Sequence, residues 1–144
     1  MDALTQQIAD LLDEQETRYQ TLKRILARQV ACLQRADLAG VGTTNAEIRE
    51  AMGQLARLET RLTPLVRPWQ ERPEAAGSPI SEKAEAMCAM VTDLQNLRAQ
   101  SEGLTKALMA RTRQEMMSLS AGAQAVRGYA PRPPEEARFV DRTR

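Results

Sequence analysis

Side chains able to carry enzyme chemistry are scarce in this sequence of 144 residues. Histidine is absent, which removes the commonest general base and the commonest metal ligand. The two cysteines, Cys32 and Cys88, lie far apart in the sequence and, without histidine, do not make a zinc site. Adjacent carboxylates at positions 13–14 and 135–136 have no nucleophile or base beside them. We therefore expect no catalytic residues, no cofactor and no bound metal, and hence a protein that is not an enzyme.

The charge balance argues against nucleic acid and lipid as partners. The chain has 20 basic and 19 acidic residues, a net charge of +1 that gives no general attraction to polyanions. Arginines towards the C-terminus are interleaved with acidic residues, and aromatic residues that could stack on bases make up only 3% of the chain. No apolar run approaches the roughly 18 residues of a membrane-spanning helix, and residues 1–13 lack the features of a signal peptide. These observations predict a cytoplasmic protein.

The chemistry that the sequence does offer is apolar and adaptable. Five of the seven methionines lie between positions 87 and 117, among leucines and valines at helical spacing. Methionine side chains are flexible and polarizable, so they adapt to partner surfaces as well as filling a core. Met87 and Met90 are expected in a core, whereas Met116 and Met117 fit either place. Whether these side chains fill a core or contact a partner therefore depends on the helices that position them.

Apolar periodicity predicts a first helix over residues 2–36. Ala, Leu, Met, Gln, Glu and Arg dominate the composition, and these residues are strong helix formers. The segment carries a heptad seam with steps of three and four, in which Gln15 and Gln29 fill two slots. Additional apolar residues widen the seam, which suggests packing against two helices. The seam and its flanking residues are Leu4, Ile8, Leu11, Leu12, Tyr19, Leu22, Ile25, Leu26, Val30 and Leu33.

A second helix is predicted over residues 45–66. Residues 37–43 are expected to form a turn, because Gly40 and Gly42 can adopt the left-handed conformation that ends a helix. Thr44 and Glu47 then have the spacing of a capping box. The expected seam is Ile48, Met52, Leu55, Leu58 or Glu59, Leu62 and Leu65, with a kink or unwinding at Pro64.

Residues 67–79 are predicted to be a loop, because they contain three prolines. Trp69 within this loop is interpreted either as a lid over the end of the bundle or as an anchor for a partner. A third helix follows over residues 80–127. Its stripe is Met87, Met90, Val91, Leu94, Leu97, Leu104, Leu108, Met116, Leu119 and Val126.

The expected fold is all-α. Residues 1–127 are predicted to form an elongated antiparallel three-helix bundle, or a coiled-coil hairpin with a long C-terminal helix. Residues 128–144 are rich in proline and charge and are predicted to be an extended or disordered tail. The third helix should be longer than the first by about 12 residues, or roughly 18 Å. If the three helices alternate in direction, the last turns of the third helix extend beyond the loop that joins the first two helices, and they face water.

Contiguous apolar surface that faces water usually marks an interaction site. We expect a partner's amphipathic helix to pack on the last turns of the third helix. The predicted partner-binding residues are Leu104, Leu108, Met109, Met116, Leu119, Val126 and Tyr129.

Three runs of residues carry a resemblance to a known family. They are Leu11 to Gln15 followed by Tyr19 and Leu22, Leu33 to Leu38 with Ala36 where the family often has glycine, and Gly128 to Pro131. In these runs and in its long helices the chain resembles the flagellar export chaperones of the FlgN type. The resemblance implies a cytoplasmic chaperone that holds the hook-associated (hook-filament junction) subunits before type III export. It also implies that the subunits dock on the C-terminal helix over residues 104–129, with the export apparatus as a further partner.

Two functions remain open on the sequence alone. The chain is either such a chaperone, or a structural coiled-coil scaffold or export-apparatus regulator without chaperone activity. A chaperone should form a one-to-one complex with an amphipathic helix of a secreted subunit, whereas a scaffold should associate with itself through its own seams.

Overall fold

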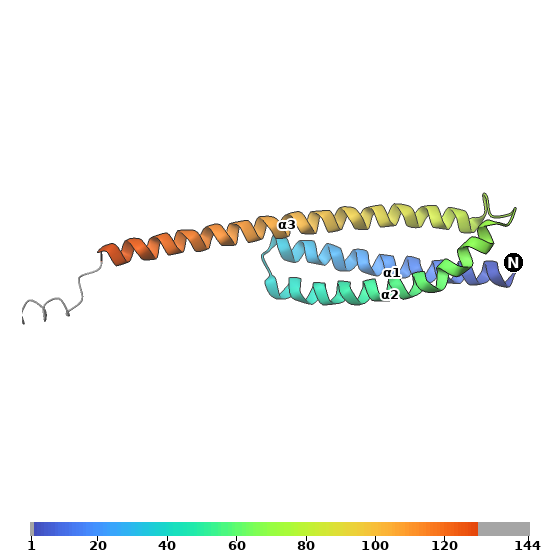
Figure 1. Cartoon of the computed structure of the whole chain (residues 1–144), viewed down its shortest axis with the longest axis horizontal. Helices are drawn as coiled ribbons and strands as arrows, with labels where there is room; N and C mark the ends of the chain where they lie inside the picture. Colours follow the sequence, from blue (N-terminus) through green and yellow to red (C-terminus); the bar gives the residue numbers. More distant parts are fainter. Residues whose placement is uncertain (1, 130–144) are drawn as a thin grey trace, which may run out of the picture. The chain divides into compact units, whose positions relative to one another are not determined.

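The computed structural model describes residues 2–129, which form three long helices (Figure 1). Helix α1 spans Ala3–Gln34, α2 spans Leu38–Gln70 and α3 spans Pro79–Tyr129. The described residues contain no strand, which confirms the all-α prediction. In none of the three helices is any stretch apolar enough, over the length a bilayer demands, to cross a membrane.

The chain divides into two units within α3. The first unit, Met1–Lys106, holds α1, α2 and the beginning of α3, and the second, Ala107–Arg144, holds the rest of α3. Helix α3 ends at Tyr129, so Gly128 and Tyr129 are helical, although the sequence predicted that the tail begins at residue 128. The rest of that predicted tail, residues 130–144, lies outside the described residues.

Helices α1 and α2 form an antiparallel hairpin, as their side-chain partners show. Arg18 donates a hydrogen bond to Gln54, with 2.6 Å between Nη1 and Oε1, and Arg28 pairs with Glu47. Residue numbers along α2 therefore decrease in the direction in which residue numbers along α1 increase. The predicted antiparallel arrangement of the first two helices is confirmed.

Helix α3 runs parallel to α1 within the first unit. The partners that join the two helices are separated by a nearly constant number of positions: 70 for Asp13 and Lys83, 70 for Lys23 and Asp93, and 72 for Gln29 and Ser101. A constant difference means that the two helices rise together. The first unit is therefore a three-helix bundle in which successive helices alternate in direction.

The core of this bundle lies on the face of α1 that the heptad pattern predicted. Ten residues of α1 are buried, and they form a stripe wide enough to contact both other helices. One cluster joins Leu22, Ile25 and Leu26 of α1 to Ala51 and Leu55 of α2 and to Leu94 of α3. The expectation that the first helix packs against two others is thus confirmed.

Helix α3 is attached to the bundle along one narrow line. Its buried residues are Ile80, Met87, Leu94 and Ser101, which are spaced by seven and so repeat a single heptad position. Met90, Val91, Leu97 and Leu104 beside this line are half-buried. The third helix therefore buries far less of its surface than α1 does.

The turn between α1 and α2 is shorter than the sequence predicted. Helix α2 begins at Leu38, so Gly40 and Gly42 lie in its first turns, and the left-handed residue is Ala36 with φ 55°. The cap is Asp37, whose side chain accepts a hydrogen bond from the backbone N–H of Gly40 at 3.0 Å. The predicted turn over 37–43 is wrong, because a carboxylate that satisfies a free N–H outweighs the low helix propensity of the two glycines.

Thr44 does not open the helix as predicted. It lies inside α2, where its hydroxyl donates back to the carbonyl oxygens of Gly40 and Val41, both at 3.0 Å. The predicted capping box of Thr44 and Glu47 is therefore wrong.

The prolines near the end of α2 do not stop it. The helix continues through Pro64 and Pro68 to Gln70, so the predicted end at residue 66 is wrong and the loop is confined to residues 71–78. Leu62, Leu65 and Trp69 pack against the cluster of Ile8, Leu12, Ile80 and Met87. This packing holds the last turns in helical form despite the missing N–H groups. Trp69 belongs to α2 and packs at this end of the bundle, in agreement with its interpretation as a lid.

Candidate partner-binding surfaces

The second unit presents an uncovered apolar stripe along α3. Every residue from Met109 to Tyr129 is exposed in the part of the chain that the structure describes. The exposed fraction reaches 65% for Met116, 74% for Leu119 and 70% for Val126. The predicted exposure of these side chains is confirmed.

Most of these apolar side chains share one face of the helix. Steps of three and four residues relate Met109, Thr112, Met116, Leu119, Ala123 and Val126, which we call the C-terminal stripe. At about 100° per residue, Met117 and Tyr129 fall on other faces. Of the seven predicted partner-binding residues, four therefore lie on the stripe, whereas Tyr129 does not.

The remaining two predicted residues lie nearer the start of α3. Leu104 belongs to the first unit and Leu108 to the second, and both are half-buried. Their side chains are therefore less available than those of the stripe.

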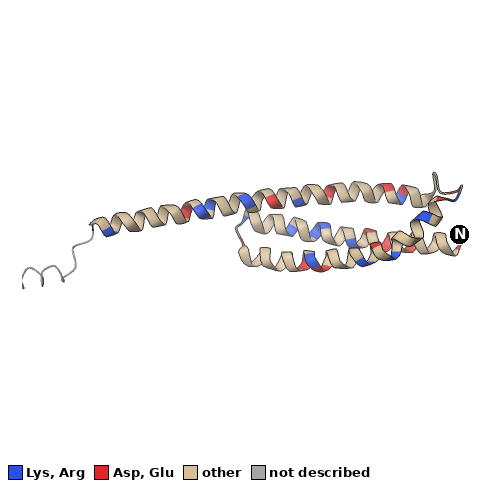
Figure 2. Ribbon diagram, in the orientation of Figure 1, with Lys and Arg blue, Asp and Glu red and all other residues tan. Residues whose placement is uncertain are grey.

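Few charges accompany the C-terminal stripe, as Figure 2 shows for the last part of α3. Between residues 107 and 129 the charged residues are Arg111, Arg113, Glu115 and Arg127, which give a net charge of +2. Arg111 and Glu115 form an ion pair along the helix, with 3.8 Å between Nε and Oε1. The surroundings of the stripe are thus mildly basic.

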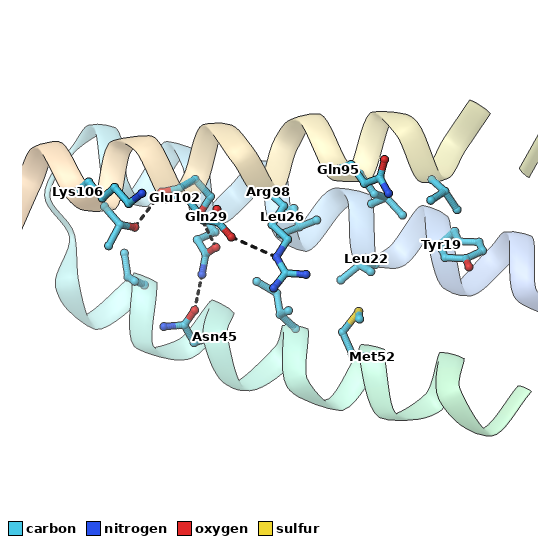
Figure 3. A pocket seen from close by; sticks show the side chains of 16 residues that line it. Tyr19, Leu22, Leu26, Gln29, Asn45, Met52, Gln95, Arg98, Glu102 and Lys106 are labelled. Atoms are coloured by element: carbon cyan, nitrogen blue, oxygen red, sulfur yellow. Dashed lines mark hydrogen bonds and ion pairs between the residues drawn. The ribbon is translucent and has the colours of Figure 1, made fainter. Parts of the chain in front are cut away.

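A second surface lies in the first unit, where the sequence predicted none. A groove of about 700 Å³ is lined by side chains of all three helices (Figure 3). Leu22 and Leu26 of α1 and Leu94 of α3 form its apolar floor, and Ile48 and Met52 of α2 line one wall. We call this space the inter-helix groove.

Met52 shows why the sequence did not predict the groove. The seam proposed for the second helix placed Met52 in the core, but its side chain is 48% exposed and lines the groove. The buried positions of α2 are Thr44, Ala51, Leu55 and Leu58. The small side chain of Ala51 faces α1 where the pattern had placed Met52. Burial of Ala51 in place of its larger neighbour is a difference that hydrophobicity alone does not reveal.

Near one end, the groove lining includes a buried polar network. Gln29 donates from Nε2 to Oδ1 of Asn45 at 2.6 Å and to Oγ1 of Thr44 at 3.3 Å, and it accepts from Oγ of Ser101 at 2.7 Å. All three helices therefore meet at this amide. Among the described residues no buried side-chain N or O atom lacks a partner, so the layer is fully satisfied.

The α3 wall of the groove is charged, whereas the α2 wall is not. Arg98, Glu102 and Lys106 line the α3 side, and Arg98 pairs with Glu102 with 3.4 Å between Nε and Oε1. Lys106 forms no ion pair with any described residue. At the other end of the groove, burial raises the pKa of the Tyr19 hydroxyl above its ordinary value, and the nearby Glu59 carboxylate adds to the rise.

Comparison with protein families gives a match over most of the chain. The family model described as "FlgN protein" matches residues 1–132. No curated protein and no solved structure matches. The matched range includes the inter-helix groove and the whole C-terminal stripe.

Proposed function

The chain belongs to the FlgN family of flagellar export chaperones, and on this premise we propose that it binds hook-associated subunits before their type III export. In this proposal the chaperone acts in the cytoplasm, engages an amphipathic helix of each subunit and catalyses no reaction. The export apparatus is a further proposed partner, to which the loaded chaperone would deliver its cargo.

The exposed C-terminal stripe is the observation that supports this proposal most directly. Met109, Met116, Leu119 and Val126 repeat at the spacing by which two helices pack against each other. Burial of each side chain contributes about 1.5–3 kcal/mol, so together they would supply on the order of 6–12 kcal/mol before the costs of association. The costs of association offset much of that gain, so the stripe by itself supports a weak and reversible contact.

The remaining predicted residues flank this face in the proposed complex. Leu104 and Leu108 would extend the apolar contact toward the start of α3, and their partial burial limits what they add. Tyr129 lies on another face of the helix, so it would contact only the edge of a bound helix.

The test mixes the full chain with a purified hook-associated subunit and measures the complex by size-exclusion chromatography with light scattering. A one-to-one complex is expected. Met116→Asp and Leu119→Asp should each weaken it by about tenfold or more, because a charge is placed in an apolar contact. Gln114→Asp is the matched control, because Gln114 is exposed on the opposite face of the same turns.

Two results would contradict the proposal. One is full binding by Leu119→Asp, since the stripe would then not be the binding face. The other is a wild-type chain that associates with itself and ignores the subunit, as a structural scaffold would. Thermal melting followed by circular dichroism accompanies each variant, since a large loss of stability would show that the residue belongs to a core.

A further inference from the structure

We propose that the inter-helix groove is a second docking site, separate from the C-terminal stripe, and that it holds an acidic amphipathic helix supplied by another protein. The site lies wholly within the first unit, where α1, α2 and α3 all contribute side chains. Its occupancy does not depend on which face of α3 binds an export subunit.

The dimensions of the groove fit a short stretch of helix. Its lining on α1 extends from Tyr19 to Gln29, a rise of roughly 15 Å or about three helical turns. A helix about 10 Å wide fills roughly 400 Å³ per turn. A space of about 700 Å³ therefore accepts three turns with somewhat more than half of their volume embedded.

The walls specify how such a helix is oriented around its own axis. Its apolar face would meet the floor of Leu22, Leu26 and Leu94 and the side chain of Met52. On the α2 side the lining is uncharged, whereas on the α3 side Lys106 is a cation without an ion-pair partner among the described residues. An acidic side chain on the α3 edge of the occupant would pair with Lys106, and Figure 3 shows this edge along the upper helix.

Charge also discriminates against a second copy of this chain. The most obvious apolar helix that a second copy offers is its own C-terminal stripe, whose surroundings carry a net charge of +2. The charged residues that line the groove, Arg98, Glu102 and Lys106, sum to +1. Two surfaces of the same sign repel, so the groove favours a partner helix with acidic flanks over the chain's own basic one.

The test uses the full chain with methyl-¹³C-labelled methionine and two synthetic peptides of about 18 residues, long enough to form a helix. Both peptides carry leucines at heptad spacing, and their flanking residues are glutamate in one and lysine in the other. The methyl signal of Met52 should shift with the glutamate peptide and not with the lysine peptide. The signals of Met116 and Met117 report separately on the second unit, whose C-terminal stripe can also bind an amphipathic helix, so the Met52 signal alone tests the groove.

A charge reversal provides the matched variant. Lys106→Glu should weaken binding of the glutamate peptide by about tenfold and strengthen binding of the lysine peptide. The Lys106 side chain is exposed, so thermal stability should not change. Leu119→Asp, which tests the proposed chaperone face, should leave the Met52 response intact, and so the two proposals can fail separately.

Four outcomes would overturn this inference. The first is a Met52 signal that neither peptide moves. The second is an equal shift with both peptides, since charge would then not select the occupant. The third is a Met52 signal that moves with protein concentration alone, which would make a second copy the occupant. The fourth is a Met52 signal that moves when residues 130–144 are removed, which would make the chain's own C-terminus the occupant.

Discussion

The hydroxyl of Ser101 donates a hydrogen bond of 2.7 Å to Oε1 of Gln29, and both side chains are buried. Gln29 uses its amide nitrogen for Thr44 and Asn45, so a single side chain of α1 contacts both other helices. A buried polar layer of this kind favours one register over its neighbours, because any slip leaves a polar group unpaired.

Ser101→Ala should therefore destabilise the bundle by about 1–2 kcal/mol, because it leaves Oε1 of Gln29 without its donor. Urea unfolding of the full chain, followed by circular dichroism, measures the change. Ser118→Ala is the matched control: the same substitution in an exposed turn of α3 should cost nothing or stabilise slightly. Equal stability of the two variants would show that the network does not hold the register.

The two glycines at the start of α2 should respond in opposite directions to alanine. A Cβ at Gly40 would lie 2.5 Å from Oδ2 of Asp37 and 2.6 Å from Sγ of Cys32, whereas a Cβ at Gly42 meets nothing within 4 Å. Gly40→Ala should cost about 1–3 kcal/mol through the clash and the disturbed cap. Gly42→Ala should stabilise by up to about 1 kcal/mol. Thermal melts of both variants decide the matter, and a stabilised Gly40→Ala would contradict the close packing.

Ala36→Gly should stabilise the chain by about 1 kcal/mol, because Ala36 is held at φ 55°, where a Cβ is strained. Ala121→Gly, in an exposed turn of α3, should instead destabilise by roughly 1 kcal/mol. Denaturant midpoints measure both changes, and a fall in stability for Ala36→Gly would refute the account.

The cap of α1 should make stability depend on pH in the acid range. Asp2 accepts a hydrogen bond of 2.8 Å from the backbone N–H of Thr5 and pairs with Arg72, and these contacts lower its pKa from 3.8 to about 2. A folded-state pKa below the unfolded one gives stability that is present above about pH 4 and is lost as the pH falls towards 2. Asp2→Asn should melt below the wild type at pH 7, and the gap should close by pH 2.

Thermal melts at a series of pH values would show this convergence. Glu85→Gln serves as the control for removal of one exposed carboxylate, since Glu85 forms no ion pair with a described residue. A gap between Asp2→Asn and the wild type that persists unchanged to pH 2 would exclude the charged cap as its source.

Apolar periodicity predicted α1 and its buried face well, because no glycine or proline interrupts the pattern in that helix. Most of its predicted seam is buried, together with Leu11, Ile25 and Val30 beside it, whereas Gln15 and Tyr19 are only half-buried. The start of α2 was missed because two glycines resemble a helix end, whereas the local contact between Asp37 and Gly40 decides the boundary. Its end was missed because Pro68 weakens a helix locally while Trp69 is held by packing against residues distant in the sequence.

The two candidate surfaces also differ in whether they could be predicted from the sequence. The C-terminal stripe could be predicted, because exposure of Met116 and Leu119 follows from a helix that continues without a partner in the described chain. The groove could not, because an apolar residue such as Met52 gives the same signal whether it faces a neighbouring helix or an unfilled space. Only the position of Ala51 against α1 distinguishes the two cases.

The constant separation of about seventy positions between α1 and α3 has a kinetic consequence. Contacts within the hairpin close loops as short as 15 positions, as between Gln29 and Thr44, whereas Gln29 and Ser101 are 72 apart. The longer closure costs roughly 1.4 kcal/mol more in chain entropy, and α3 gains only four buried residues from docking. We expect pulsed hydrogen exchange during refolding to protect α1 and α2 before residues 80–101. Simultaneous protection would disprove this order. During synthesis the hairpin could then form while most of α3 is still in the ribosome.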